Sequence, residues 1–175
     1  MDPSLLEVLE VPTPTGKVFD LEAWQAAEAK LRTPLPDDIK QFNQTYGMGM
    51  IGGEILVRVP VRVGGFAFTA DGSAPDTLDM LNEAGEIDPQ VAIYPDESGL
   101  LAWASSQNGD LWFWVTEGEP NDWTVAVVPR TALRQVIYFY DLNATSYLAR
   151  FAAEQLDDDF SREWPFSRST YVTRP

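Results

Sequence analysis

The stretch LPDDIKQFNQTYGMGMIG, residues 35–52, decides the fold of this chain. Its last residues, 47–52, contain the G-x-G-x-x-G spacing of dinucleotide-binding domains. Such glycines hold phosphates only where a strand ends and a helix begins, because the phosphates then lie at the helix N-terminus. The order of the elements around the glycines therefore determines whether this spacing is a nucleotide site.

The residues before the glycines predict a helix, and those after them predict a strand. Pro36 suits a first helical turn because its φ is fixed, and Asp37 and Asp38 place negative charge at the positive end of the helix dipole. Apolar residues then recur at helical spacing, at Ile39, Phe42 and Tyr46. Residues 54–59 alternate and are rich in β-branched side chains. This order is the reverse of a phosphate site, so we interpret the glycines as a backbone corner in which Gly47 has a positive φ.

The rest of the chain predicts an α+β fold with a central, mostly antiparallel sheet, and with N-terminal and C-terminal helices packed on it. Asp20 is expected to cap a helix that ends near Arg32. Asn143 is expected to cap another helix, whose inner face carries Tyr147, Leu148, Phe151 and Leu156. Strands are predicted at 61–69, 91–94, 100–105, 110–116, 123–129 and 135–140, with a short helix near 76–82. Asn108 and Gly109 predict a hairpin.

We divide the chain into three parts. Residues 1–17 contain proline and threonine without periodicity, so we expect a loosely held N-terminal arm. Residues 18–160 are the length of a single domain and are apolar enough to form a core. Residues 161–175 form a C-terminal tail whose mixed polar and aromatic pattern predicts no element.

The aromatic strand LWFWV, residues 111–115, has two interpretations. A period of two places Trp112 and Trp114 on one face and Phe113 on the other, so both faces are apolar. The first interpretation is a central strand covered on both sides. The alternative is an open tryptophan platform for a peptide, a sugar or a protein partner.

The composition excludes several kinds of chemistry. The chain has no cysteine and no histidine, so it has no disulfide, thiol nucleophile, imidazole base or Cys/His zinc site. The N-terminal residues lack the basic start and apolar core of a signal peptide, and no apolar run is long enough to cross a bilayer. We therefore expect a cytoplasmic protein without a membrane partner and without a cofactor.

The acidic residues are concentrated in the middle of the chain. The net charge is −15, and the interval 63–129 contains no lysine or arginine. One interpretation is a solubilising acidic surface; the other is a docking face for a basic protein partner, and both disfavour nucleic acid. The carboxylates predicted for that face are Asp71, Asp76, Asp79, Glu83, Glu86, Asp88, Asp96, Glu97, Glu117 and Glu119.

Carboxylates are also the main remaining route to acid–base catalysis or metal binding. Two carboxylates at a suitable separation can cleave glycosides, and acidic clusters can bind magnesium or calcium. However, Asp157, Asp158 and Asp159 lack the alternating spacing of a calcium loop and fit a solvated helix end. A carboxylate-dependent hydrolase is thus an alternative, and the main expectation is a protein that is not an enzyme and has no metal site.

The order of these features resembles the SUKH superfamily, the Smi/Knr-like domains. The resemblance covers about residues 20–156 and depends most on the Leu-Pro and Tyr-Gly-x-Gly block of residues 35–49. The acidic segment 71–90 is longer than a minimal domain of this type needs. The matching residues, which the resemblance implies are framework, are Trp24, Leu35, Pro36, Phe42, Tyr46, Gly47, Gly49, Gly109 and Asp110.

The resemblance implies an α+β domain without catalytic activity. Many bacterial members are similar to immunity proteins, which bind and neutralise a cognate toxin domain that is often a nuclease. Nucleases are basic because they hold phosphate backbones, so an acidic inhibitor would complement one. The alternative within the superfamily is a regulatory or scaffolding domain with a different protein partner.

Overall fold

The computed structural model describes residues 1–12, 20–58, 91–130 and 136–173. Within them the chain forms a seven-stranded antiparallel sheet of order β6-β5-β4-β3-β2-β1-β7. The strands are β1 Gly49–Ile51, β2 Ile55–Val57, β3 Leu100–Ser106, β4 Leu111–Val115, β5 Thr124–Val128, β6 Tyr138–Tyr140 and β7 Tyr171–Thr173. The helices are α1 Leu5–Val8, α2 Leu21–Leu31, α3 Asp37–Tyr46, the 3₁₀ turn η1 Pro120–Asp122, α5 Ala144–Ala152 and α6 Asp159–Arg162. The predicted α+β class is confirmed.

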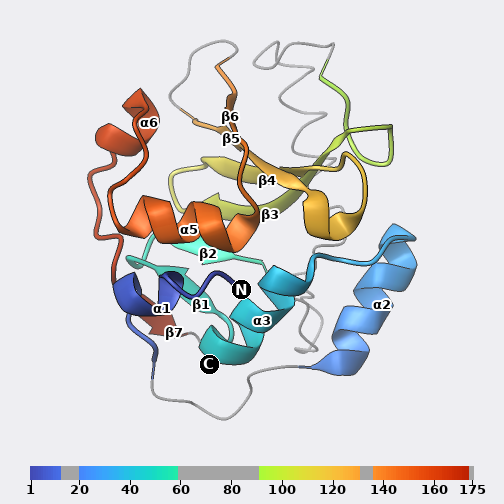
Figure 1. Cartoon of the computed structure of the whole chain (residues 1–175), viewed down its shortest axis with the longest axis horizontal. Coiled ribbons are helices and arrows are strands. Elements are labelled where there is room, and N and C mark those ends of the chain that lie inside the picture. Colours follow the sequence, from blue (N-terminus) through green and yellow to red (C-terminus); the bar gives the residue numbers. More distant parts are fainter. Residues whose placement is uncertain (13–19, 59–90, 131–135, 174–175) are drawn as a thin grey trace.

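Helices cover one face of the sheet and form the main core there. Figure 1 shows α1, α3 and α5 side by side over the sheet, and each of the other two contacts α5. The buried side chains between the layers include Trp112 and Trp114 of β4 and Tyr147 and Phe151 of α5. A smaller cluster around Phe113 lies on the opposite face. The tryptophans are therefore core, as the interpretation of a covered central strand predicted.

The glycine-rich stretch is a backbone corner between α3 and β1. Gly47 has φ 71° and donates its N–H to the carbonyl oxygen of Asn43 at 2.8 Å. Gly52 has φ 62° and donates its N–H to the carbonyl oxygen of Thr170 at 2.8 Å. The helix precedes the strand as predicted, and these two amides are bound to protein carbonyls. The three-residue strand β1 was not predicted, because the glycines around it weaken the strand pattern.

The hairpin and the N-termini of two helices form where the sequence predicts them. Strands β3 and β4 pair across Asn108 and Gly109, and Gly109 has φ 96°. The carboxylate of Asp20 accepts the N–H of Ala23 and the side chain of Asn143 accepts the N–H of Ser146, so both predicted N-caps are confirmed. Both caps are local hydrogen bonds, which is why the sequence predicts them well.

Two predicted elements are wrong in extent. The inner face of α5 does not include Leu156, because the helix ends at Ala152 and the chain turns at Glu154, whose φ is 58°. Residues 91–94 form only one bridge, between Ile93 and Leu100, because the chain turns back there through hydrogen bonds from Asp96 to Ile93 and from Gly99 to Asp96. The strand predicted at 61–69 and the helix predicted near 76–82 lie outside the described residues.

The expectation of a loosely held arm is wrong for residues 1–12. Leu5 and Leu9 are buried in the main core, and the hydroxyl of Tyr46 donates to the carbonyl oxygen of Leu9 at 3.2 Å. Helix α1 has four residues and is too short to show a helical period, so no local pattern predicts it. Its stability comes from packing against α5.

The C-terminal tail completes the sheet. Strand β7 pairs antiparallel with β1, and the hydroxyl of Tyr171 donates to the carbonyl oxygen of Gly47 at 3.0 Å. Asp158 caps α6 by accepting the N–H of Ser161 at 2.7 Å, while Asp157 and Asp159 are exposed. The tail therefore belongs to the same packed unit as the glycine corner.

Asp2 anchors α1 to α5, and its replacement by alanine should lower the free energy of unfolding by about 1 kcal/mol at pH 7. The hydroxyl of Ser4 donates to its carboxylate at 2.6 Å and that of Ser146 at 2.8 Å, which lowers the pKa of Asp2 below its usual value. A carboxylate whose pKa is lower in the folded state stabilises the fold at pH values above its unfolded pKa, which is about 4. This stabilisation is lost as the pH falls below that value and through the folded-state pKa. Urea unfolding at pH 7 and pH 3 measures both effects. An equal loss of unfolding free energy in Asp2→Ala at both pH values would contradict the role of the charge. The control is Glu7→Gln, because Glu7 is exposed on α1.

Candidate functional site

Five exposed carboxylates lie at one end of the sheet, which we call the acidic end. Leu100 of β3 pairs with Val115 of β4, and Val115 pairs with Thr124 of β5. The register therefore brings the loop before β3 and the loop after β4 to the same end of the sheet. The carboxylates on these two loops are Asp96, Glu97, Glu117, Glu119 and Asp122, and all are exposed.

Hydrogen bonds hold the two acidic loops in place. Both the backbone N–H and the hydroxyl of Thr116 donate to the carbonyl oxygen of Gly99, at 3.1 and 2.8 Å. The side chain of Asn121 accepts the backbone N–H of Asp37 at 2.8 Å and donates to its carboxylate at 3.1 Å. The acidic end is therefore joined to the start of α3, where Asp37 adds a further exposed carboxylate.

Among the described residues, the basic side chains beside the acidic end do not neutralise it. The acidic loops, 95–99 and 116–123, contain no lysine or arginine. Lys40 is paired with Glu28 at 2.6 Å and lies 3.7 Å from Asp37. Arg32 is exposed at the end of α2, near Tyr94. The acidic end therefore keeps an excess of negative charge in solvent, where it can attract a positively charged surface.

The structure brings together only part of the predicted docking face. Of the predicted carboxylates, Asp96, Glu97, Glu117 and Glu119 lie at the acidic end. The remaining predicted carboxylates lie outside the described residues: Asp71, Asp76, Asp79, Glu83, Glu86 and Asp88. Asp122 also lies at the acidic end, although it was not among the predicted contacts.

The residues that the resemblance implies are framework lie in the interior or in turns. Trp24 donates its Nε1–H to the side chain of Asn43 at 3.1 Å, which joins α2 to α3. Asp110 accepts the hydroxyl of Ser106 at 2.6 Å and the backbone N–H of Arg130 at 2.9 Å, which fixes the hairpin. The others are the buried Leu35, Pro36, Phe42, Tyr46 and Gly49, and the turn glycines Gly47 and Gly109.

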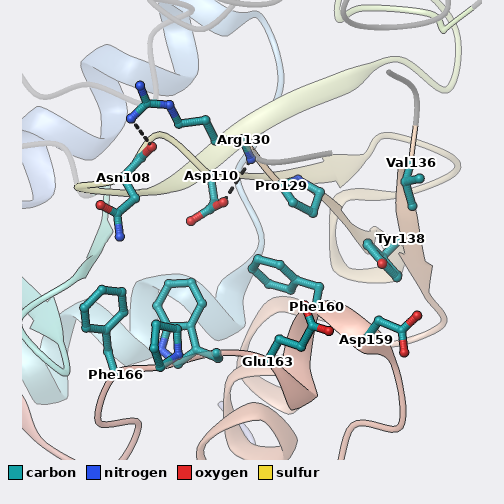
Figure 2. Close-up of a pocket in the computed structure, with 12 residues that line it drawn as sticks. Asn108, Asp110, Pro129, Arg130, Val136, Tyr138, Asp159, Phe160, Glu163 and Phe166 are labelled. Carbon is teal, nitrogen blue, oxygen red and sulfur yellow. Dashed lines mark hydrogen bonds between the residues drawn. The ribbon is translucent and has the colours of Figure 1, made fainter. Parts of the chain in front are cut away.

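A pocket lies at the opposite end of the sheet from the acidic end. Its volume is about 570 Å³, and it lies between the β3–β4 hairpin, the end of β5, β6 and α6 (Figure 2). Its polar side chains are Asn108, Asp110, Arg130, Tyr138, Asp159 and Glu163, and its apolar ones are Pro129, Val136, Phe160, Trp164, Pro165 and Phe166. No local sequence pattern predicts this pocket, although Phe160 and Trp164 are separated by one helical turn.

Three tyrosines have phenols that ionise less easily than usual. Burial raises the pKa of Tyr140, Tyr147 and Tyr171, so these phenols remain protonated near neutral pH and do not act as bases. No group of three acidic side chains in the described ranges is placed to hold a metal ion. No helix in the same ranges is long and apolar enough to cross a membrane.

Comparison with known proteins assigns no family to this chain. No protein-family model matches it, and neither a curated protein nor a solved structure is significantly similar to it.

Proposed function

We propose that this chain is a non-catalytic protein-binding domain that docks a basic partner at its acidic end. The observation that carries the proposal is the gathering of Asp96, Glu97, Glu117, Glu119 and Asp122 on two adjacent loops without a basic residue. Such a surface attracts a positively charged partner over a distance and raises its association rate. It repels nucleic acid for the same reason.

The partner that fits this surface best is a basic toxin domain, with the chain acting as its immunity protein in the cytoplasm. A nuclease domain carries the required positive charge, because it binds phosphate backbones. The resemblance of about residues 20–156 to the SUKH superfamily supports the same partner. The rigid attachment of the acidic loops to Gly99 and Asp37 supports binding without a costly rearrangement.

The proposal predicts that removing three charges from the acidic end slows association with the partner. The proposal predicts that a toxin gene lies beside the gene for this chain, and the partner to test is the toxin domain that such a gene encodes, purified as an inactive variant. In the triple variant Glu97→Gln, Glu117→Gln and Glu119→Gln, we expect association to slow by about tenfold or more at low salt. The difference should disappear near 1 M salt, where the Debye length falls to about 3 Å. Stopped-flow fluorescence across a salt series measures this.

The matched control removes three exposed glutamates elsewhere. Glu7→Gln, Glu10→Gln and Glu154→Gln change the net charge by the same amount, and none of the three lies at the acidic end. Equal slowing in both triple variants would show that only total charge matters and would reject the acidic end as the docking face. Co-expression with the active toxin tests the immunity role separately, since the chain should restore growth. Absence of both binding and rescue would reject the proposed partner.

A further inference from the structure

The pocket at the hairpin end of the sheet has the size and lining of a ligand site. Its volume of about 570 Å³ falls within the range of small-molecule sites, about 300–1,000 Å³. Four aromatic side chains line it, from β6, α6 and the segment that follows α6: Tyr138, Phe160, Trp164 and Phe166. This aromatic lining limits the class of ligand that the pocket can bind.

The aromatic rings of the pocket are held by one another. The ring centroids of Phe160 lie 6.1 Å from Tyr138 and 5.6 Å from Trp164, and those of Trp164 and Phe166 are 5.5 Å apart. Behind them, Trp112 of the core contacts both Phe160 and Trp164 at about 6 Å. The rings are therefore preorganised, and a ligand does not have to order them.

The charge that faces the rings is negative. Glu163 is exposed and has no ion-pair partner among the described residues, while Asp159 is paired with Arg162 at 2.6 Å in solvent. Arg130 is the one cation among the described residues that line the pocket, and it donates its Nη1–H to the carbonyl oxygen of Asn108 at 2.9 Å. Figure 2 shows that its guanidinium points away from Phe160 and Glu163.

We propose that this pocket binds an organic cation, namely an ammonium or guanidinium group on an apolar stem. The aromatic faces attract a cation through their quadrupoles, and the stem fills the apolar part of the lining. The carboxylate of Glu163 pairs with the charged group at the rim. An anionic ligand is disfavoured by this lining and by the net charge of −15. The site lies at the other end of the sheet from the acidic end and does not depend on the function proposed above.

Binding of three probes with the same stem tests the charge preference. Hexylammonium, hexanol and hexanoate are titrated into the full chain and followed by calorimetry and by the indole N–H signals in NMR. We expect hexylammonium to bind at least about tenfold more tightly than hexanol, and hexanoate not to bind. The signals of Trp164 and Trp112 should shift, whereas that of Trp123, beside the acidic end, should not. Equal affinity for hexylammonium and hexanol, or no binding of any probe, would overturn the proposal.

Two variants and one control assign the recognition to named side chains. Glu163→Gln removes the rim charge, and Phe160→Leu removes one aromatic face while keeping the pocket apolar. Each should weaken hexylammonium binding by about fivefold, and neither should change hexanol binding by more than about twofold. Glu154→Gln, an exposed change outside the lining, should have no effect. Unchanged hexylammonium affinity in a folded Glu163→Gln variant would overturn the assignment.

A further experiment distinguishes a lysine side chain of a partner protein from a free small molecule as the source of the cation. A capped peptide with a single lysine among glycines presents the same ammonium group on a protein side chain. Tighter binding of this peptide than of hexylammonium would identify a partner's lysine as the ligand. The reverse order would identify a free small molecule, and both outcomes sustain the proposed chemistry.

Discussion

Replacing Trp112 with alanine should lower the free energy of unfolding by about 3–5 kcal/mol. This side chain is fully buried, and it contacts Phe160 of α6 and Trp164 of the tail. Its Nε1–H also donates to the hydroxyl of Tyr147 at 3.0 Å, so truncation leaves both a cavity and a buried hydroxyl without its donor. Urea unfolding followed by far-UV circular dichroism measures the loss.

The variant Trp112→Phe separates packing from the hydrogen bond. Phenylalanine fills part of the space but cannot donate to Tyr147, so we expect an intermediate loss of about 1–3 kcal/mol. Leu6→Ala is a suitable control, because Leu6 is 47% exposed and its removal should change stability by less than about 0.5 kcal/mol. A Trp112→Ala variant with unchanged stability would mean that the residue is not core and would restore the platform interpretation.

Replacing Gly52 with alanine should cost about 2–4 kcal/mol, the second largest effect that we expect. Gly52 has φ 62°, and an added Cβ would lie 1.9 Å from the carbonyl oxygen of Ser167. The methyl group would therefore push away the tail segment that leads into β7, and it would strain the hydrogen bond from Gly52 to Thr170. Thermal or urea unfolding measures the cost.

The neighbouring glycine is a matched control for this prediction. Gly53 has φ 75°, and nothing lies within 4 Å of an added Cβ. Gly53→Ala therefore carries only the backbone strain, about 1 kcal/mol. The difference between the two variants isolates the contact of the corner with the tail. Equal costs for the two substitutions would show that the tail does not pack against Gly52.

The sequence by itself determined the features that depend on neighbouring residues. Asp20 and Asn143 cap their helices through hydrogen bonds that span three residues, so their roles are visible in a short window. The hairpin at Gly109 depends on a positive φ that glycine allows most easily. The helix-before-strand order around Gly47 likewise follows from periodicity alone, and it is the reverse of the order that a phosphate site requires.

Only the tertiary structure decided the features that depend on residues far apart in the chain. Helix α1 and strand β7 are four and three residues long, too short for a period, and they form because α5 and β1 pack or pair with them. The acidic end requires the register of β3, β4 and β5, and the pocket requires α6 to lie beside β6. The composition shows that the chain is rich in carboxylates and aromatic rings. It does not show which of these side chains lie close together in the fold. Contacts of this kind arise from the burial of apolar surface between distant segments, which no local pattern encodes.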